Sequence, residues 1–343
     1  MRAVATTERA ASEVTRLLDT HVERVEPSRR KRGLPAESFR CWLADGRSVI
    51  ATCRATATRT AFEAHVLRRL AKHEADVPAV YAAEGDWLVQ EDLGSLRLSR
   101  AIAAATEANE PERVRDLLSA AIASLESIHR AGRAAGLDHD APEPERFERV
   151  LGWGEQLARR TGTKLPGLNR DGVRAAFDEL SPDAFIKSDA RPARALMRGD
   201  EVVFFDWARC ARGRRMQDLI GLLGDEALPD WPDVESAVLD RHLPQFITSL
   251  DRGRAFFAVY GTLYLTQRMG AILDLRDESG DWWPLAECLD ADHPIVTAEA
   301  YERLRVRAER WAKTSVLTAP LVRWLRELQL YQIDGFADTV KRD

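Results

Sequence analysis

The hydrophobic pattern of the first third of the chain has the short period of β-strands. Apolar runs of five or six residues are separated by turn signals such as Asp45-Gly46. These runs predict strands over 39–43, 48–53, 77–81 and 87–91. The third is expected at an edge, because Pro78 cannot donate to a strand ladder. With one amphipathic helix over 61–71, the pattern predicts a small α+β lobe.

Beyond residue 95, apolar positions follow helical spacing. The expected helices cover 98–105, 111–131, 147–158, 172–180, 216–223, 234–250, 253–276, 298–315 and 320–330, and one more covers 7–24. Gly132 indicates the end of the helix over 111–131. Loops are expected over 25–34, 136–145 and 277–283. The fold class is therefore α+β, with a small β-rich lobe over residues 1–95 and a large, mostly helical lobe over 96–343.

One stretch, 185–218, breaks the helical pattern with a strand, a loop, a strand, a turn and a strand. Asp189 follows the apolar pair Phe185-Ile186, and Asp206 ends the apolar run 201–205. Carboxylates at neighbouring strand ends can hold a divalent cation and orient a hydroxyl. On composition alone, both are more readily interpreted as loop residues that cap turns, since aspartate is common there.

Composition narrows the class of protein. A chain of 343 residues is long enough for two lobes. The net charge of −5 gives no support for a nucleic-acid or membrane binder, and no apolar run approaches the ~20 residues that span a bilayer. Its four cysteines are scattered, which fits buried thiols in a reducing compartment. We expect a cytoplasmic protein.

Several spaced motifs follow one another in an order that is informative. They are Glu63 with Leu67 and Leu70 on the first-lobe helix, Val77-Pro78, the connector 88–94, Ile128-His129, the loop 187–194, Asp206-Trp207, and Gly213 with Asp218-Leu219. In this order and spacing the chain resembles the aminoglycoside phosphotransferase / choline-kinase-like family, which shares the protein-kinase fold. The resemblance covers roughly residues 39 to 223 and implies a nucleotide-binding lobe over 1–95 and a catalytic and acceptor lobe over 96–343.

The resemblance also implies roles in phosphoryl transfer, which depends mainly on positioning and charge neutralisation. Asp189 would accept or orient the proton of the attacking hydroxyl, and Asp206 would hold the Mg²⁺ that bridges the ATP phosphates. The connector, with Glu91 and Leu93, would place its backbone against the adenine. The acceptor would be a small molecule or a peptide.

A family strand lysine that contacts the phosphates would pair with Glu63. The matching strand ends in Arg54 and contains no lysine, so Arg54 is the possible substitute. The family's glycine-rich loop is poorly represented by Arg32-Gly33-Leu34-Pro35. Lys187 and Ser188 replace the family's His-Gly pair, and Lys187 becomes a candidate phosphate contact.

The largest departure is Arg194, which stands where the family has a metal-binding asparagine. A guanidinium has donors only and cannot coordinate Mg²⁺. Arg194 could contact phosphate directly, or it could pair with Asp189 or Asp206 and close the site.

Two hypotheses therefore stay open. One is transfer of the ATP γ-phosphate, with Mg²⁺, to a hydroxyl of a small molecule or peptide. The other is a catalytically impaired pseudokinase that binds a nucleotide, a peptide or a protein partner, for example beside a lyase in ribosomal-peptide modification.

Overall fold

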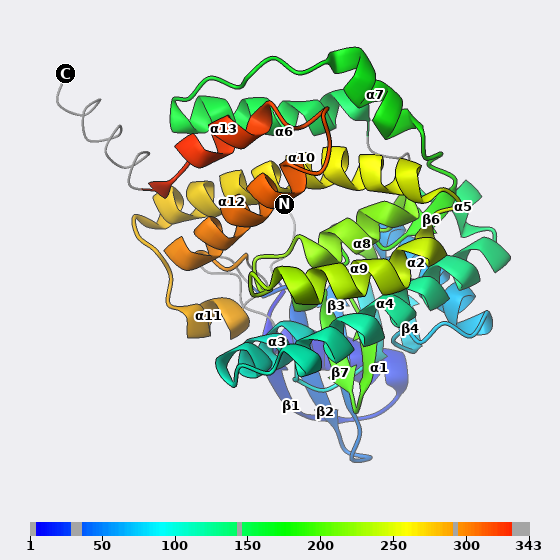
Figure 1. Cartoon of the computed structure of the whole chain (residues 1–343). Helices are drawn as coiled ribbons and strands as arrows, with labels where there is room; N and C mark the ends of the chain where they lie inside the picture. Colours follow the sequence, from blue (N-terminus) through cyan, green and yellow to red (C-terminus); the bar gives the residue numbers. More distant parts are fainter. Residues whose placement is uncertain (1–4, 29–35, 143–145, 291–293, 331–343) are drawn as a thin grey trace.

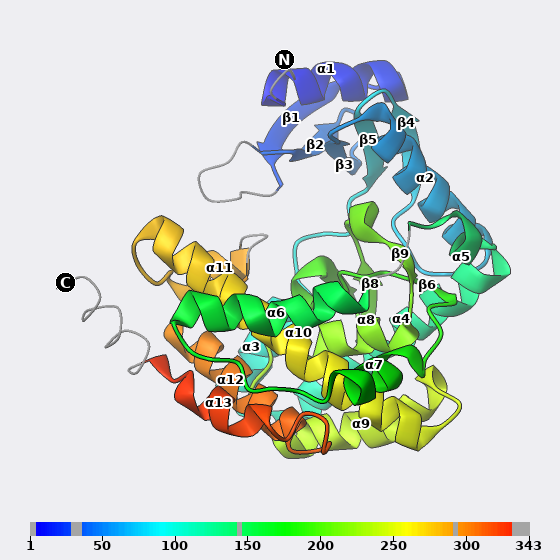
Figure 2. The same cartoon turned by 90° about the horizontal axis from the view of Figure 1, so that it is seen from above.

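The computed structural model describes residues 5–28, 36–142, 146–290 and 294–330. A β-sheet flanked by two helices forms the N-terminal part, and a larger helical part carries two short strand pairs (Figure 1). Seen from above, the sheet and α1 lie at one end of the molecule and the long helices lie at the other (Figure 2). Among the described residues, no helix is both long and apolar enough to cross a membrane.

The N-terminal sheet is antiparallel, with the strand order β1-β2-β3-β5-β4. Its elements are α1 (Thr7–Leu18), β1 (Val22–Pro27), β2 (Ser38–Leu43), β3 (Ser48–Cys53), α2 (Ala57–Lys72), β4 (Val80–Glu84) and β5 (Trp87–Glu91). β2 and β3 form the expected hairpin, because Gly46 supplies the positive φ of +85° that its tight turn needs. Cys41, Val49 and Val89 pack under Ala10 and Val14 of α1.

Three of the first-lobe expectations need correction. The strand β1 begins at Val22, so the predicted helix over 7–24 is too long and the predicted loop over 25–34 is partly strand. β1 is an edge strand in which only Val22 is buried, so its sequence is too polar for a strand signal. β4 lies at the opposite edge, as expected, but begins at Val80, after Pro78.

The second part is built from helices around one large core. They are α3 (Leu98–Glu107), α4 (Pro111–Ala134), α5 (Leu137–Asp140), α6 (Phe147–Thr161), α7 (Arg170–Asp178), α8 (Arg215–Leu223), α9 (Pro232–Phe246), α10 (Leu250–Ser279), α11 (Leu285–Asp290), α12 (Ala298–Ala312) and α13 (Leu321–Glu327). The expected loop over 136–145 contains α5, and the expected loop over 277–283 is shortened because α10 continues to Ser279. α11 was not predicted.

Gly132 does not end α4, which continues through it to Ala134. A Cβ at Gly132 would lie 2.7 Å from Cδ1 of Phe185, so the glycine allows a strand to pass close against the helix. That strand is the one that leads to Asp189.

Two strand pairs carry the loops of interest. β6 (Ala184–Ile186) pairs with β9 (Ala211–Gly213), and β7 (Ala195–Arg198) pairs with β8 (Glu201–Phe204). β9 was not predicted, because three residues give no periodic signal. Asp189 lies in the loop after β6, which we call the catalytic loop (187–194), and Asp206 lies in the loop after β8.

Candidate functional site

The Asp189 carboxylate is held by two arginines of its own loop. Arg191 Nε lies 2.6 Å from Asp189 Oδ1, and Arg194 Nε lies 3.3 Å from Asp189 Oδ2. All three side chains are about nine-tenths buried or more, with exposed fractions of 11%, 9% and 9%. Neighbouring arginines in a partly dry site strengthen this pairing, because the local dielectric is low.

Asp206 is paired in the same way from two directions. Arg194 Nη1 lies 3.1 Å from Asp206 Oδ2, and Arg54 Nη2 lies 3.3 Å from Asp206 Oδ1. The backbone of Asp206 is left-handed, with φ of 59°, as is Ser188 with φ of 67°. Such conformations cost energy in non-glycine residues and cluster at functional sites. Arg194 therefore bridges the two aspartates that the sequence singles out.

Glu63 links the first lobe to the Asp206 loop. Its Oε2 and Oε1 accept hydrogen bonds from Arg54 Nε and Nη2, each at 2.6 Å. Glu63 Oε1 also accepts from the backbone N of Trp207 at 3.0 Å. Arg54, the residue that directly follows β3, therefore reaches Glu63, which the strand pattern alone leaves undecided.

Lys187 is fully buried, and its ammonium is used inside the protein. Nζ donates to the backbone O of Asp206 at 2.8 Å and to that of Asp189 at 3.3 Å. The ammonium therefore ties the backbones of the two loops together.

Asp218, on α8, holds the start of the catalytic loop. Its two carboxylate oxygens accept from the backbone N of Lys187 at 2.8 Å and of Ser188 at 2.7 Å. His129 Nε2 lies 2.8 Å from Asp218 Oδ2. Asp218 therefore anchors the first two residues of this loop.

Both aspartates of the site are paired with cations. Burial alone would raise the pKa of Asp189, but Arg191, Arg194 and Lys187 outweigh it and hold that pKa well below its usual range. Burial lowers the pKa of Lys187, although the two aspartates oppose this. Four cations (Arg54, Lys187, Arg191, Arg194) lie beside three carboxylates (Glu63, Asp189, Asp206). Further negative charge comes from Asp218 near Lys187 and from Asp225 and Glu226 near Arg191.

The donor set does not fit Mg²⁺ as it stands. Mg²⁺ needs oxygen ligands in nearly octahedral geometry, whereas guanidiniums occupy both aspartates. Within the described ranges, no group of three or more His, Cys, Asp or Glu side chains could hold a metal ion. A metal at Asp206 would first have to displace Arg194.

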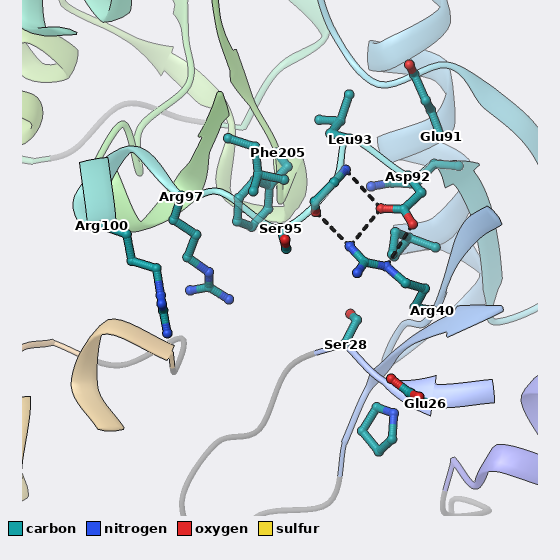
Figure 3. Close-up of a pocket in the computed structure, with 15 residues that line it drawn as sticks. Glu26, Ser28, Arg40, Glu91, Asp92, Leu93, Ser95, Arg97, Arg100 and Phe205 are labelled. Atoms are coloured by element: carbon teal, nitrogen blue, oxygen red, sulfur yellow. Dashed lines mark hydrogen bonds and ion pairs between the residues drawn. The ribbon is translucent and has the colours of Figure 1, made fainter. Parts of the chain in front are cut away.

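A cavity of about 240 Å³ lies between the sheet and the helical part. Its lining comes from β1, β2, β3, the connector, the start of α3, β7 and Phe205. Both Glu91 and Leu93 belong to this lining. Figure 3 shows Arg40 reaching the Asp92 carboxylate, with Arg97 and Arg100 nearby. Arg40 Nε lies 2.7 Å from Asp92 Oδ2, and Arg40 Nη2 donates to the Gly94 carbonyl at 2.7 Å. Because Glu91 and Asp92 are engaged within the protein, the connector offers mainly backbone to a ligand.

A buried acid pair behind Arg191 was missed by sequence reasoning. Asp225 and Glu226 follow α8, and each is 2% exposed. Arg268 pairs with Glu226, with Nη2 2.6 Å from Oε1. Burial lowers the pKa of Arg191, but Asp189 and then Glu226 and Asp225 raise it. Burial, and then the charge of Glu226, raise the pKa of Asp225 to about 7. In the sequence, this pair is marked only by two acids that follow a helix-ending glycine. Solvent-exposed loops often have the same pattern, so the sequence alone does not indicate a buried pair.

Comparisons with known proteins agree with the arrangement of lobes. A model of the phosphotransferase enzyme family (APH) matches residues 29–257. No curated protein matches the chain.

Similar solved structures include three kinase-type proteins. An aminoglycoside phosphotransferase from Alicyclobacillus acidocaldarius subsp. acidocaldarius DSM 446 is 12% identical, covers 96% of this chain and 98% of its own, and has a TM-score of 0.51. A choline/ethanolamine kinase family protein from Mesorhizobium loti is 15% identical, with coverages of 93% and 99% and a TM-score of 0.51. The amicoumacin kinase hAmiN, in complex with AMP-PNP, Ca²⁺ and Ami, is 14% identical, with coverages of 76% and 88% and a TM-score of 0.50. At these identities the likeness concerns the fold, and it confirms the expected two-lobed, protein-kinase-like α+β class.

Proposed function

The chain belongs to the phosphotransferase enzyme family, and from this premise we propose that it binds a nucleotide in its cleft while Mg²⁺-dependent transfer is impaired. The resemblance stated from the sequence is thereby confirmed at the level of the family. The observation that carries the proposal is the position of Arg194, whose guanidinium pairs with Asp189 and Asp206 together. Two arginines pair with the Asp189 carboxylate, so it is not available to accept a proton from a hydroxyl. Arg194 also pairs with the Asp206 carboxylate, which is the group that would bind a metal.

Nucleotide binding is supported by the cavity at the connector and by the cations beyond it. The cavity of about 240 Å³ has the size and the partly apolar lining, including Leu93 and Phe205, that suit a planar base. We propose that the base lies against the connector from Glu91 to Leu93. Arg54 and Arg194 would then supply the positive charge that phosphates need. ATP or ADP is therefore the proposed ligand.

A second candidate is an active ATP- and Mg²⁺-dependent transferase that phosphorylates a hydroxyl of a small molecule or a peptide. The Arg54–Glu63 pair supports it, because Arg54 pairs with Glu63 as the family's phosphate-contacting lysine would. In this reading ATP would draw Arg194 away from Asp206, and Asp206 would become available to a metal. A protein partner that binds the impaired form is compatible only with the first proposal.

Replacement of Arg194 by Asn distinguishes the two. In the first proposal, ADP binds the wild type with nearly the same affinity with and without Mg²⁺. Arg194→Asn should make that affinity depend on Mg²⁺ by about tenfold or more, because one charged partner of Asp206 is removed. Isothermal titration calorimetry with ADP, with and without MgCl₂, measures this.

Arg68→Asn is the matched control, since Arg68 is an exposed arginine of α2 that does not line the cavity at the connector. It should leave both affinities unchanged. Mg²⁺-dependent ATP turnover by the wild type that collapses in Asp206→Ala would establish the second candidate. Absence of ADP binding to the wild type would contradict both proposed functions.

A further inference from the structure

A second cavity, of about 230 Å³, lies on the helical part and away from the connector. It is formed by the end of α4, the start of β6, the first residue of α8 and the end of α9. These elements lie in one region of the molecule (Figure 1). Its basic lining residues are Arg130, Arg133 and Arg215, which together we call the arginine pocket. None of these residues belongs to the catalytic loop or the connector.

The three arginines have no carboxylate partner among the residues that the structure describes. Arg215 Nη1 donates to the backbone O of Gln245 at 3.0 Å, and Arg130 Nη2 donates to Ser127 Oγ at 3.3 Å. Glu126, the acid of the lining, faces His242, with Glu126 Oε1 3.7 Å from His242 Nδ1. The three arginines outnumber the one acid of the lining, so the pocket carries a net positive charge.

The positive charge of this pocket changes the pKa of Arg215. Burial, and then the positive charge of Arg133, lower the pKa of Arg215, while Asp183 and Glu126 oppose the shift only in part. Two guanidiniums that repel each other across a cavity gain from an anion between them. Arg215 is also the first residue of the nine-residue helix α8, whose N-terminal end favours negative charge.

The wall of the pocket leads to the catalytic loop. His129 lines the pocket and is 6% exposed, with its ring edge-on to Phe246 at 5.7 Å between centroids. Its Nε2 lies 2.8 Å from the Asp218 carboxylate, which accepts the backbone N–H groups of Lys187 and Ser188. His129 and Asp218 therefore link the wall of the pocket to the catalytic loop by hydrogen bonds.

We propose that the arginine pocket binds a small oxyanion of the phosphate class, either inorganic phosphate or the phosphate group of a small phosphorylated molecule. Guanidiniums match phosphate oxygens in geometry and charge. The site is distinct from the nucleotide cleft, so it does not depend on the function proposed for that cleft. His129, which lines the pocket, is hydrogen-bonded to the Asp218 carboxylate that holds the start of the catalytic loop.

The test is binding of inorganic phosphate to the full chain in low-salt buffer, followed by calorimetry and thermal unfolding, with chloride at equal ionic strength as the reference. Phosphate should raise the unfolding temperature of the wild type, and Arg133→Gln or Arg215→Gln should weaken phosphate binding by about tenfold. Arg133→Lys should restore part of it. Glucose 6-phosphate, compared with glucose and with phosphate, separates the two sources: tighter binding than phosphate indicates a phosphorylated metabolite, and equal binding indicates phosphate alone.

The control is Arg68→Gln, which removes the same charge from an exposed site on α2 and should leave phosphate binding as in the wild type. The proposal is overturned if phosphate has no effect beyond that of chloride. It is equally overturned if the effect persists in Arg133→Gln and Arg215→Gln, since phosphate would then bind elsewhere.

Discussion

At the residue scale, Arg194 shows what the sequence could and could not determine. The alignment of its position with a metal-binding asparagine allowed either a phosphate contact or a closed pair with one of the aspartates. The structure gives a bridge, with Arg194 Nε 3.3 Å from Asp189 and Nη1 3.1 Å from Asp206. Which acid an arginine reaches depends on the backbone path of two loops, and a single sequence carries no information on that path.

Asp225 is the residue at which a pH dependence of stability should originate. Its folded-state pKa is raised to about 7 from an ordinary 3.8, so between these values the folded chain binds a proton that the unfolded chain does not. The free energy of unfolding therefore falls as pH rises from 4 to 7 and is level above 7. Glu226 strengthens this effect, while Arg191, Arg268 and the Ala227 backbone N–H oppose it.

Asp225→Asn should remove this contribution. The wild type should lose ~2–3 kcal/mol of unfolding free energy from pH 5 to pH 8 because of Asp225, since each pH unit below the raised pKa is worth ~1.4 kcal/mol. The variant should lose that much less over the same pH change. Urea denaturation of both proteins at the two pH values measures the difference. Parallel pH profiles for the two proteins would show that Asp225 is ionised throughout.

At the element scale, periodicity gave accurate bounds for the buried strands, gave shifted bounds for the exposed strand β4 and missed the exposed strand β1. β3 and β5 were predicted with their exact bounds because β3 is largely buried and β5 nearly completely so. β1 was missed because charged side chains occupy most of its exposed positions. Gly132 was misassigned because a glycine that ends a helix and one that admits a neighbour look the same in sequence.

Gly132→Ala tests that close approach. The new Cβ would lie 2.7 Å from Phe185 Cδ1 and 2.9 Å from Phe185 Cβ, so β6 or its aromatic side chain must move. Overpacking costs ~1–3 kcal/mol and outweighs the ~1 kcal/mol that alanine gains in a helix interior. We expect a net loss of stability in urea denaturation.

Gly152→Ala is the matched control, since Gly152 lies within α6 and a Cβ there meets nothing within 4 Å. It should stabilise the protein by ~0.5–1 kcal/mol. If both substitutions stabilise, the contact between α4 and β6 has room for a methyl group, contrary to this account.

At the scale of the whole molecule, one carboxylate connects the two parts. Glu63 is fully buried on α2, pairs with Arg54 at the end of β3, and accepts from the backbone N of Trp207 beyond β8. The order of lobes and the presence of this acid followed from spaced motifs. The meeting of its partners could not be predicted, because residues 63 and 207 are joined only by tertiary packing.

Removal of Glu63 should therefore act on stability and on the site together. Glu63→Ala leaves the Arg54 guanidinium and the Trp207 N–H without their shared acceptor, and breaking a buried pair costs ~3–5 kcal/mol. Glu13→Ala, which breaks an exposed pair with Arg16 on α1, should cost less than ~1 kcal/mol. Hydrogen exchange should show the Trp207 amide losing protection in Glu63→Ala and keeping it in Glu13→Ala. Equal costs for the two variants would mean that Glu63 does not join the lobes, and the position of Arg54 against Asp206 would then have to be fixed by Arg194 and the catalytic loop alone.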